Sequence, residues 1–193
     1  MGLPVPKGKF LRKGEGPYPD NLRYPLVVKV SSESITSKTD VHGVRTGISG
    51  EGEMRAAVDE LMLLDGAEGV LIEEMAPQGT EVIVGGITDA QFGPVIMFGL
   101  GGIFVELFKD VSFGLAPLSQ EGALRLVKQV KGYRLLQGYR GRPPLDVKSL
   151  ADIIVAVSEL TATGLAGEID LNPVVLYPEG AMVLDAKMSM PGA

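Results

Sequence analysis

The chain has 193 residues, of which 45 % are hydrophobic, so it can hold one sizeable domain or two small lobes around a real core. Its formal net charge of -6 and the lack of a basic stripe exclude binding to nucleic acid through the phosphate backbone. With no cysteine and one histidine, it cannot form disulfides, thiolate metal sites or multi-histidine zinc sites, and the lack of cysteine fits a cytoplasmic protein.

Neither a signal peptide nor a membrane span is expected. The N-terminal residues do not combine basic residues with an apolar core. The most apolar run, residues 93–108, contains Glu106 and several glycines, and it is shorter than the roughly 20 apolar residues that a span needs. We therefore expect a soluble protein without a membrane partner.

Apolar periodicity predicts an α/β chain in which short helices separate groups of strands. The expected strands are short apolar runs at residues 9–11, 26–30, 44–48, 69–75, 81–88, 94–98 and 168–173, with further strand-like pieces up to residue 115 and at residues 184–187. Apolar positions three and four apart predict helices over residues 51–64 and 119–131 and a third helix capped by Asp146.

The two C-terminal strands carry hard oxygen ligands. Residues 168–173 contain Asn172 and residues 184–187 contain Asp185, and only a short turn separates the two segments. A hairpin sets this amide opposite this carboxylate, and Mg²⁺ needs few protein oxygens when phosphate and water supply the others. The alternative is an ordinary surface hairpin whose polar residues belong to its turn.

Other polar residues interrupt apolar strands, where an unpaired charge is costly to bury. Lys29 lies within a valine-rich strand, Glu73 and Glu74 end another, and Glu81 opens the next. Taken singly, a strand lysine is an edge residue and a glutamate at a strand end is solvated. Taken together with the C-terminal amide and acid, they suit a nucleotide with its Mg²⁺, because phosphoryl transfer needs mainly positioning and charge neutralisation.

The order of these residues and the motifs around them resemble one family. The matching stretches are, in chain order, Gly-Leu-Pro-Val-Pro-Lys-Gly-Lys at 2–9, Tyr-Pro-Leu-Val-Val-Lys-Val at 24–30, Ser-Lys-Thr-Asp-Val-His-Gly-Val at 37–44, Glu-Glu-Met-Ala-Pro at 73–77, Gly-Thr-Glu-Val at 79–82, Gln-Phe-Gly-Pro-Val at 91–95, Met-Phe-Gly-Leu-Gly-Gly-Ile-Phe-Val-Glu at 97–106, Lys-Asp-Val at 109–111, Tyr-Arg-Gly-Arg-Pro-Pro at 139–144 and Asp-Leu-Asn-Pro at 170–173. From residue 2 almost to the C-terminus, the chain resembles the ATP-grasp domain of NDP-forming acyl-CoA synthetases. It looks most like the β component of ADP-forming acetyl-CoA synthetase and is more distantly similar to the β subunit of succinyl-CoA synthetase.

The resemblance implies roles for individual residues. It implies that Lys29 binds phosphate and that the loop residues Ser37, Lys38 and Thr39 cover the phosphates. It implies that Glu73, Glu74 and Ala76 form an adenine-binding hinge and that Glu81 contacts the ribose. It also implies that Asn172 and Asp185 bind Mg²⁺, and it places Glu106 in a matching glycine-rich stretch.

The implied fold is α/β (α+β), an ATP-grasp fold with a small lobe of about residues 21–75 and a large lobe of about residues 1–20 and 76–193, with ATP or ADP bound between them as substrate. The implied function is that of the nucleotide component of an acid–thiol ligase, an ADP-forming acyl-CoA (acetyl-CoA) synthetase. It transfers phosphoryl between the nucleotide and a phosphohistidine. The implied partner is a CoA-binding or ligase subunit (α component) in a hetero-oligomer.

Two departures from the family pattern leave alternatives open. Ser37 stands where the family usually has a histidine, and the only histidine, His42, follows five residues later. His42 is either a phosphate carrier in a shifted position or an inert loop residue, and we favour the second interpretation. Residues 12–23, rich in glycine and proline, cannot form the helix that the family has there. The alternative function is therefore a degenerate, non-catalytic nucleotide-binding or scaffolding subunit, and a carboxylate–amine ligase is a third hypothesis that the glycine-rich stretch disfavours.

Overall fold

The computed structural model of the chain describes residues 2–35, 37–102 and 107–191, so Glu106 lies outside the described residues. The chain divides into two compact units. One, the 6–77 unit, spans Pro6–Pro77, and the other, the C-terminal unit, combines the residues up to Val5 with those from Gln78 onward. None of the helices in the described ranges is long and apolar enough to cross a membrane.

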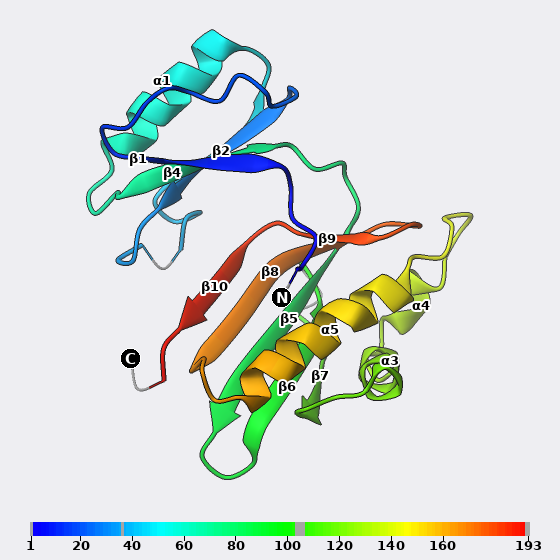
Figure 1. Cartoon of the computed structure of the whole chain (residues 1–193). Coiled ribbons are helices and arrows are strands. Elements are labelled where there is room, and N and C mark those ends of the chain that lie inside the picture. The colour runs from blue at the N-terminus through cyan, green and yellow to red at the C-terminus, as the bar shows by residue number, and fades with distance from the viewer. Residues whose placement is uncertain (1, 36, 103–106, 192–193) are drawn as a thin grey trace. The chain divides into compact units, whose positions relative to one another are not determined.

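The 6–77 unit is a four-stranded antiparallel sheet with one helix packed against it (Figure 1). The sheet order is β1-β4-β2-β3, and the strands are β1 Gly8–Arg12, β2 Leu26–Ser31, β3 Val44–Ile48 and β4 Gly69–Glu74. Helix α1 spans Glu51–Met62, and its buried face consists of Met54, Ala57, Val58 and Leu61. This apolar face packs on the buried residues of the sheet and forms one core with them.

The C-terminal unit is a six-stranded antiparallel sheet with helices on one face (Figure 1). The sheet order is β10-β8-β5-β6-β7 with β9 beside β8, and the strands are β5 Thr80–Asp89, β6 Gly93–Leu100, β7 Val111–Leu115, β8 Glu168–Leu176, β9 Ala181–Val183 and β10 Ala186–Ser189. The helices are α3 Gln120–Lys128, α4 Tyr133–Leu136 and α5 Val147–Ala162. Helix α5 begins at Asp146, whose carboxylate accepts hydrogen bonds from the backbone N–H and the hydroxyl of Ser149 at 3.0 and 2.7 Å.

The two faces of the six-stranded sheet differ in what covers them. Val82 and Val84 of β5 and Ile96 and Phe98 of β6 are buried in the core that the sheet forms with α3 and α5. Because successive residues of a strand point to opposite faces, the residues between them point away from these helices. We call this second face of the sheet the open face.

Mixed helices and antiparallel sheets confirm the predicted fold class, but the chain is divided differently from the expected lobes. Residues 6–20, expected in the large lobe, belong to the 6–77 unit because β1 pairs with β4, from Gly8 opposite Glu73 to Arg12 opposite Gly69. Strands β4 and β5, which follow one another in the sequence, belong to different sheets. The predicted helix over residues 119–131 ends at Lys128, and the short helix α4 was not predicted.

Candidate functional site

The C-terminal hairpin brings Asn172 and Asp185 side by side. The backbone N–H of Asn172 donates to the carbonyl of Asp185 at 3.2 Å, and that of Leu184 donates to the carbonyl of Pro173 at 3.0 Å. These bonds lie where the partner of β8 changes from β9 to β10. Asn172 is exposed and Asp185 is half-buried, so both side chains are accessible to a ligand.

A third oxygen-bearing side chain belongs to this cluster. Asp170 lies two residues before Asn172 on the same face of β8 and pairs with Lys187 of β10. Burial raises the pKa of Asp170, Lys187 lowers it, and the carboxylates of Glu168 and Asp185 raise it further. The sequence analysis did not assign Asp170 to the site, although its alternation with Asn172 along the strand was a visible signal.

The donor chemistry of this cluster fits a hard cation held partly by a nucleotide. Mg²⁺ prefers oxygen ligands, and Asn172 and Asp185 supply an amide and a carboxylate. Within the described parts of the chain, no group of three or more His, Cys, Asp or Glu side chains is placed to hold a metal ion. A Mg²⁺ ion here would therefore complete its coordination with phosphate and water, as nucleotide-bound Mg²⁺ does.

In the 6–77 unit, Lys29 and Glu73 form a buried ion pair. The Nζ atom of Lys29 lies 2.6 Å from Oε2 of Glu73, and the side chains are only 12 % and 7 % exposed. Glu73 pairs with Val27 on the neighbouring strand, so Lys29 is its diagonal neighbour on the same sheet face. The lysine is thus held in a fixed position at the sheet surface.

The loop between β2 and β3 contains the residues expected to cover the phosphates. Ser37 and Lys38 are half-buried and Thr39 is exposed. The backbone N–H of Gly43 donates to the carbonyl of Lys38 at 2.6 Å and closes the loop. His42 is exposed in this loop with a left-handed backbone, φ 51°.

The expected hinge residues stand at the end of the 6–77 unit. Glu74 is the last residue of β4, where its Oε1 accepts a hydrogen bond from the backbone N–H of Arg23 at 3.1 Å. The backbone N–H of Met75 donates to the carbonyl of Pro25 at 2.9 Å, and Ala76 is half-buried. In the sequence, the unit ends at Pro77, directly after these residues.

Glu81 lines a pocket of about 700 Å³ in the C-terminal unit. The pocket also contains Tyr139, Arg140 and Arg142 from the basic loop, and the guanidinium of Arg140 lies 5.5 Å from the centre of the Tyr139 ring. Gly101 is required beside Glu81, since a Cβ at this position would lie 2.8 Å from the Glu81 backbone. The sequence analysis placed no site residue in the basic loop.

Arg140 has a left-handed backbone, with φ 51°. This conformation costs about 1–3 kcal/mol in a residue other than glycine, and such residues are concentrated at functional sites. In the described part of the chain, neither Arg140 nor Arg142 is within salt-bridge distance of a carboxylate. The pocket therefore offers two guanidinium groups and an aromatic ring beside a carboxylate.

Comparison with known proteins agrees with this fold. The family profile of the ATP-grasp domain matches residues 1–190. The β subunit of acetate–CoA ligase [ADP-forming] I from Pyrococcus furiosus is 44 % identical over 197 aligned positions, which cover 97 % of this chain and 85 % of that one. The β subunit of acetate–CoA ligase [ADP-forming] II from the same organism is 38 % identical, with 99 % and 86 % covered.

A solved structure shares the fold over nearly the whole chain. Acetyl-coenzyme A synthetase 1 of Candidatus Korarchaeum cryptofilum, in complex with coenzyme A and Ca-AMPCP, has a TM-score of 0.86 and 37 % identity, covering 98 % of this chain and 87 % of that one. The same enzyme with Mg-AMPPCP, its phosphohistidine segment pointing towards the nucleotide binding site, has a TM-score of 0.80 and 38 % identity, covering 98 % and 86 %. The chain therefore belongs to the ATP-grasp family and is a homologue of the β subunits of ADP-forming acetate–CoA ligases.

Proposed function

We propose that this chain is the nucleotide-handling component of an ADP-forming acyl-CoA synthetase, with acetyl-CoA as the reference substrate. The observation that carries the proposal is the accessible cluster of Asp170, Asn172 and Asp185 on one face of the C-terminal hairpin. Its donor set fits a Mg²⁺ ion that is shared with the phosphates of ATP or ADP. Relatives whose names specify this reaction align over nearly the whole chain.

We propose nucleotide-binding roles for the residues that the family resemblance singles out. Lys29 neutralises phosphate, and Glu73 orients this lysine through their 2.6 Å ion pair. Ser37, Lys38 and Thr39 form the loop over the phosphates, and the hinge of Glu73, Glu74 and Ala76 binds the adenine. Glu81 binds the ribose hydroxyls, and the aromatic ring and guanidinium groups in its pocket suit a base and phosphates.

The proposed reaction is phosphoryl transfer between ATP and a histidine. The bond between the γ-phosphorus and the bridging oxygen of ADP breaks, and a bond to an imidazole nitrogen forms. In the reverse direction, which makes ATP, the P–N bond breaks. A bound Mg²⁺ would supply charge neutralisation, whereas the residues of this chain position the phosphates and exclude water.

We place the accepting histidine on a CoA-binding partner subunit. His42 is exposed in the loop between β2 and β3 and has a left-handed backbone. Acyl recognition also belongs to the partner. The second candidate function is a degenerate, non-catalytic subunit of such a complex, and the observation that favours it is Ser37 at the position where the family usually has a histidine.

Reconstitution distinguishes the two candidates. The chain is mixed with its CoA-binding partner subunit, acetyl-CoA, ADP, phosphate and Mg²⁺, and ATP is measured by luciferase luminescence. The proposal predicts ATP formation that depends on both chains and is lost in Asp185→Ala, while Leu165→Ala, an exposed position outside the site, retains it. A complex that assembles and binds Mg-ATP but makes no ATP contradicts the catalytic assignment and favours the degenerate one.

A further inference from the structure

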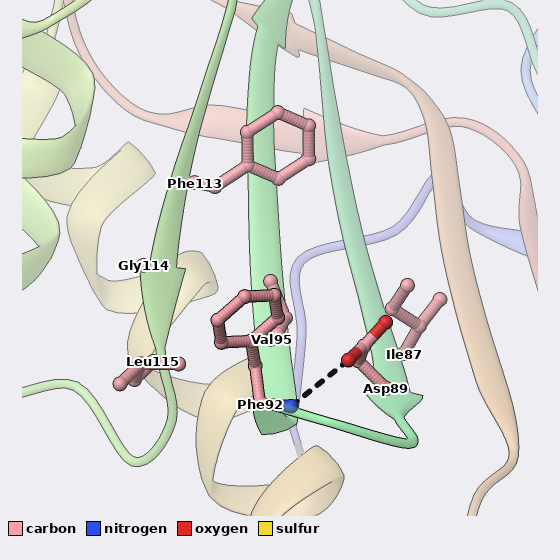
Figure 2. A pocket seen from close by; sticks show the side chains of 7 residues that line it. All are labelled: Ile87, Asp89, Phe92, Val95, Phe113, Gly114 and Leu115. Atoms are coloured by element: carbon pink, nitrogen blue, oxygen red, sulfur yellow. Dashed lines mark hydrogen bonds between the residues drawn. The ribbon is translucent and has the colours of Figure 1, made fainter.

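A second feature of the open face is an apolar groove of about 430 Å³ across β5, β6 and β7. Figure 2 shows its lining, in which the aromatic rings of Phe92 and Phe113 lie along the sheet surface, with Ile87, Val95 and Leu115 beside them. Phe92 and Phe113 are 68 % and 59 % exposed. Exposed aromatic rings that gather with other apolar side chains on one surface are typical of a binding site.

The groove adjoins the proposed metal-binding cluster on the same sheet face. Gly85 of β5 lies directly opposite Asp170 of β8, and Ile87 opposite Glu168. Ile87 at the groove is thus the diagonal neighbour of Asp170, at a separation of roughly 7–8 Å between backbones. Gly85 contributes no side chain between the carboxylate cluster and the groove, and the side chain of Met97 on β6 lies beside it, with its Cε 3.6 Å from where a Cβ of Gly85 would be.

The edge of the groove carries negative charge. The carboxylate of Asp89 accepts hydrogen bonds from the backbone N–H groups of Gln91 and Phe92 at 2.8 and 2.9 Å, and these bonds lower its pKa. Glu168 is exposed beside Ile87. The carboxylates of Asp89 and Glu168 flank the apolar residues, so a ligand with apolar side chains and basic neighbours complements this surface.

We propose that this groove is the docking site for the segment of the partner subunit that carries the phosphoryl-accepting histidine. The proposal rests on the function proposed above. A histidine that receives phosphate at the Asp170–Asn172–Asp185 cluster must approach along the open face, and the groove is the apolar surface next to it. A second copy of this chain fits less well, because it would bring the same two carboxylates against one another.

The test compares partner binding by two groove variants and a matched control. Phe92→Glu and Phe113→Glu place a charge in the groove. The control Leu165→Glu places a charge outside the groove, at a position of the same unit that is 66 % exposed. Affinity for the CoA-binding subunit is measured by surface plasmon resonance, and affinity for Mg-ATP by calorimetry. We expect each groove variant to bind the partner at least about tenfold more weakly, with unchanged Mg-ATP affinity and an unchanged control.

Other outcomes overturn the docking proposal. Unchanged partner affinity in both groove variants refutes it, and so does a groove variant that weakens Mg-ATP binding while the partner still binds normally. If the wild-type chain is a dimer by light scattering and the groove variants are monomers that still bind the partner, the occupant is a second copy. A wild-type chain that binds the partner but no Mg-ATP instead refutes the proposed function, which keeps the two failures distinguishable.

A measurement on the unsubstituted complex does not depend on the folding of any variant. Hydrogen–deuterium exchange is compared for the chain alone and bound to its partner. We expect slower exchange in residues 87–95 and 111–115 and little change in residues 120–128 of α3, on the helix-covered side. Protection confined to other surfaces overturns the proposal.

Discussion

The ion pair of Lys29 and Glu73 allows the clearest test of how this fold stabilises buried charges. Glu73→Gln removes the negative charge but keeps the side-chain volume, and Lys29→Met removes the positive charge with similar length. Either change leaves the other group buried beside a neutral side chain, with 12 % exposure for Lys29 and 7 % for Glu73. In Lys29→Met, the carboxylate of Glu73 loses the opposite charge across this contact without regaining water, and in Glu73→Gln the ammonium of Lys29 loses this carboxylate contact.

The expected magnitude follows from the geometry. The contact between Nζ and Oε2 is 2.6 Å long, and even two unit charges about 4 Å apart attract by about 4 kcal/mol at an effective dielectric constant of about 20. Removal of one member of a buried pair costs about 3–5 kcal/mol in measured cases. We expect each single variant to lose ~3 kcal/mol of unfolding free energy, which lowers Tm by roughly 6–12 °C in a chain of this size.

The double variant Lys29→Met with Glu73→Gln tests the reasoning. It buries no charge at this position, so its loss should be smaller than the sum of the single losses by about 2 kcal/mol or more. Urea unfolding followed by circular dichroism measures all four proteins, since the chain has no tryptophan. The exposed pair Arg55 and Glu51 serves as the control and should show much weaker coupling. Additive losses at Lys29 and Glu73 would refute the reasoning.

Three further predictions concern the C-terminal unit. Asp146→Ala should lower the unfolding free energy by about 1 kcal/mol, since this residue caps α5 and the Ser149 N–H holds its pKa below the ordinary value. That contribution is present above the unfolded pKa of about 3.9 and disappears as the pH falls through the lowered folded value. Urea unfolding should therefore show a larger difference in unfolding free energy between wild type and variant at pH 7 than at pH 2. An equal difference at the two pH values would contradict this prediction. Burial raises the pKa of Asp170, so folding disfavours its ionised form. Asp170→Asn should therefore increase the unfolding free energy above the raised pKa, and this increase should disappear below about pH 3.9. Destabilisation by this variant at pH 7 would show that the burial argument is wrong. Arg142→Ala should weaken ATP binding in calorimetry, whereas Arg134→Ala, exposed and outside the pocket, should not, and equal effects would remove Arg142 from the nucleotide site.

Much of the local structure could be predicted from the sequence because it follows from short-range rules. The spacing of apolar residues in α1 and α5 marks one buried face in each helix, and Asp146 provides a cap that depends only on residues three positions away. The C-terminal hairpin was predicted because two apolar segments are separated by a short turn. Lys29 was noticeable because a charge rarely occurs within a valine-rich strand.

The features that were not predicted depend on contacts between distant segments. The pairing of β1 with β4 joins residues more than fifty positions apart, and nothing in residues 8–12 indicates which strand they join. The ion pair between Lys29 and Glu73 requires the register of β2 against β4. Asp170 is an unremarkable strand residue until β10 brings Asp185 and Lys187 beside it.

The apolar groove was also invisible in the sequence. Phe92 and Phe113 are typical strand and turn residues, and apolar residues in strands are usually buried. Only the sheet order, with β5, β6 and β7 side by side and the helices on the opposite face, brings them together on an exposed surface. The reason is that alternation predicts two faces for each strand but does not say which face the helices cover.

The central claim is that Asn172 and Asp185 bind the Mg²⁺ of a bound nucleotide, and calorimetric titration with Mg-ATP tests it most directly. We expect the wild-type chain to bind Mg-ATP, and Asn172→Ala and Asp185→Ala each to weaken this binding at least tenfold, on the order of 1.4 kcal/mol. Glu179→Ala, exposed in the turn of the same hairpin, should bind as tightly as the wild type. Equal Mg-ATP affinity in all four proteins would contradict the account.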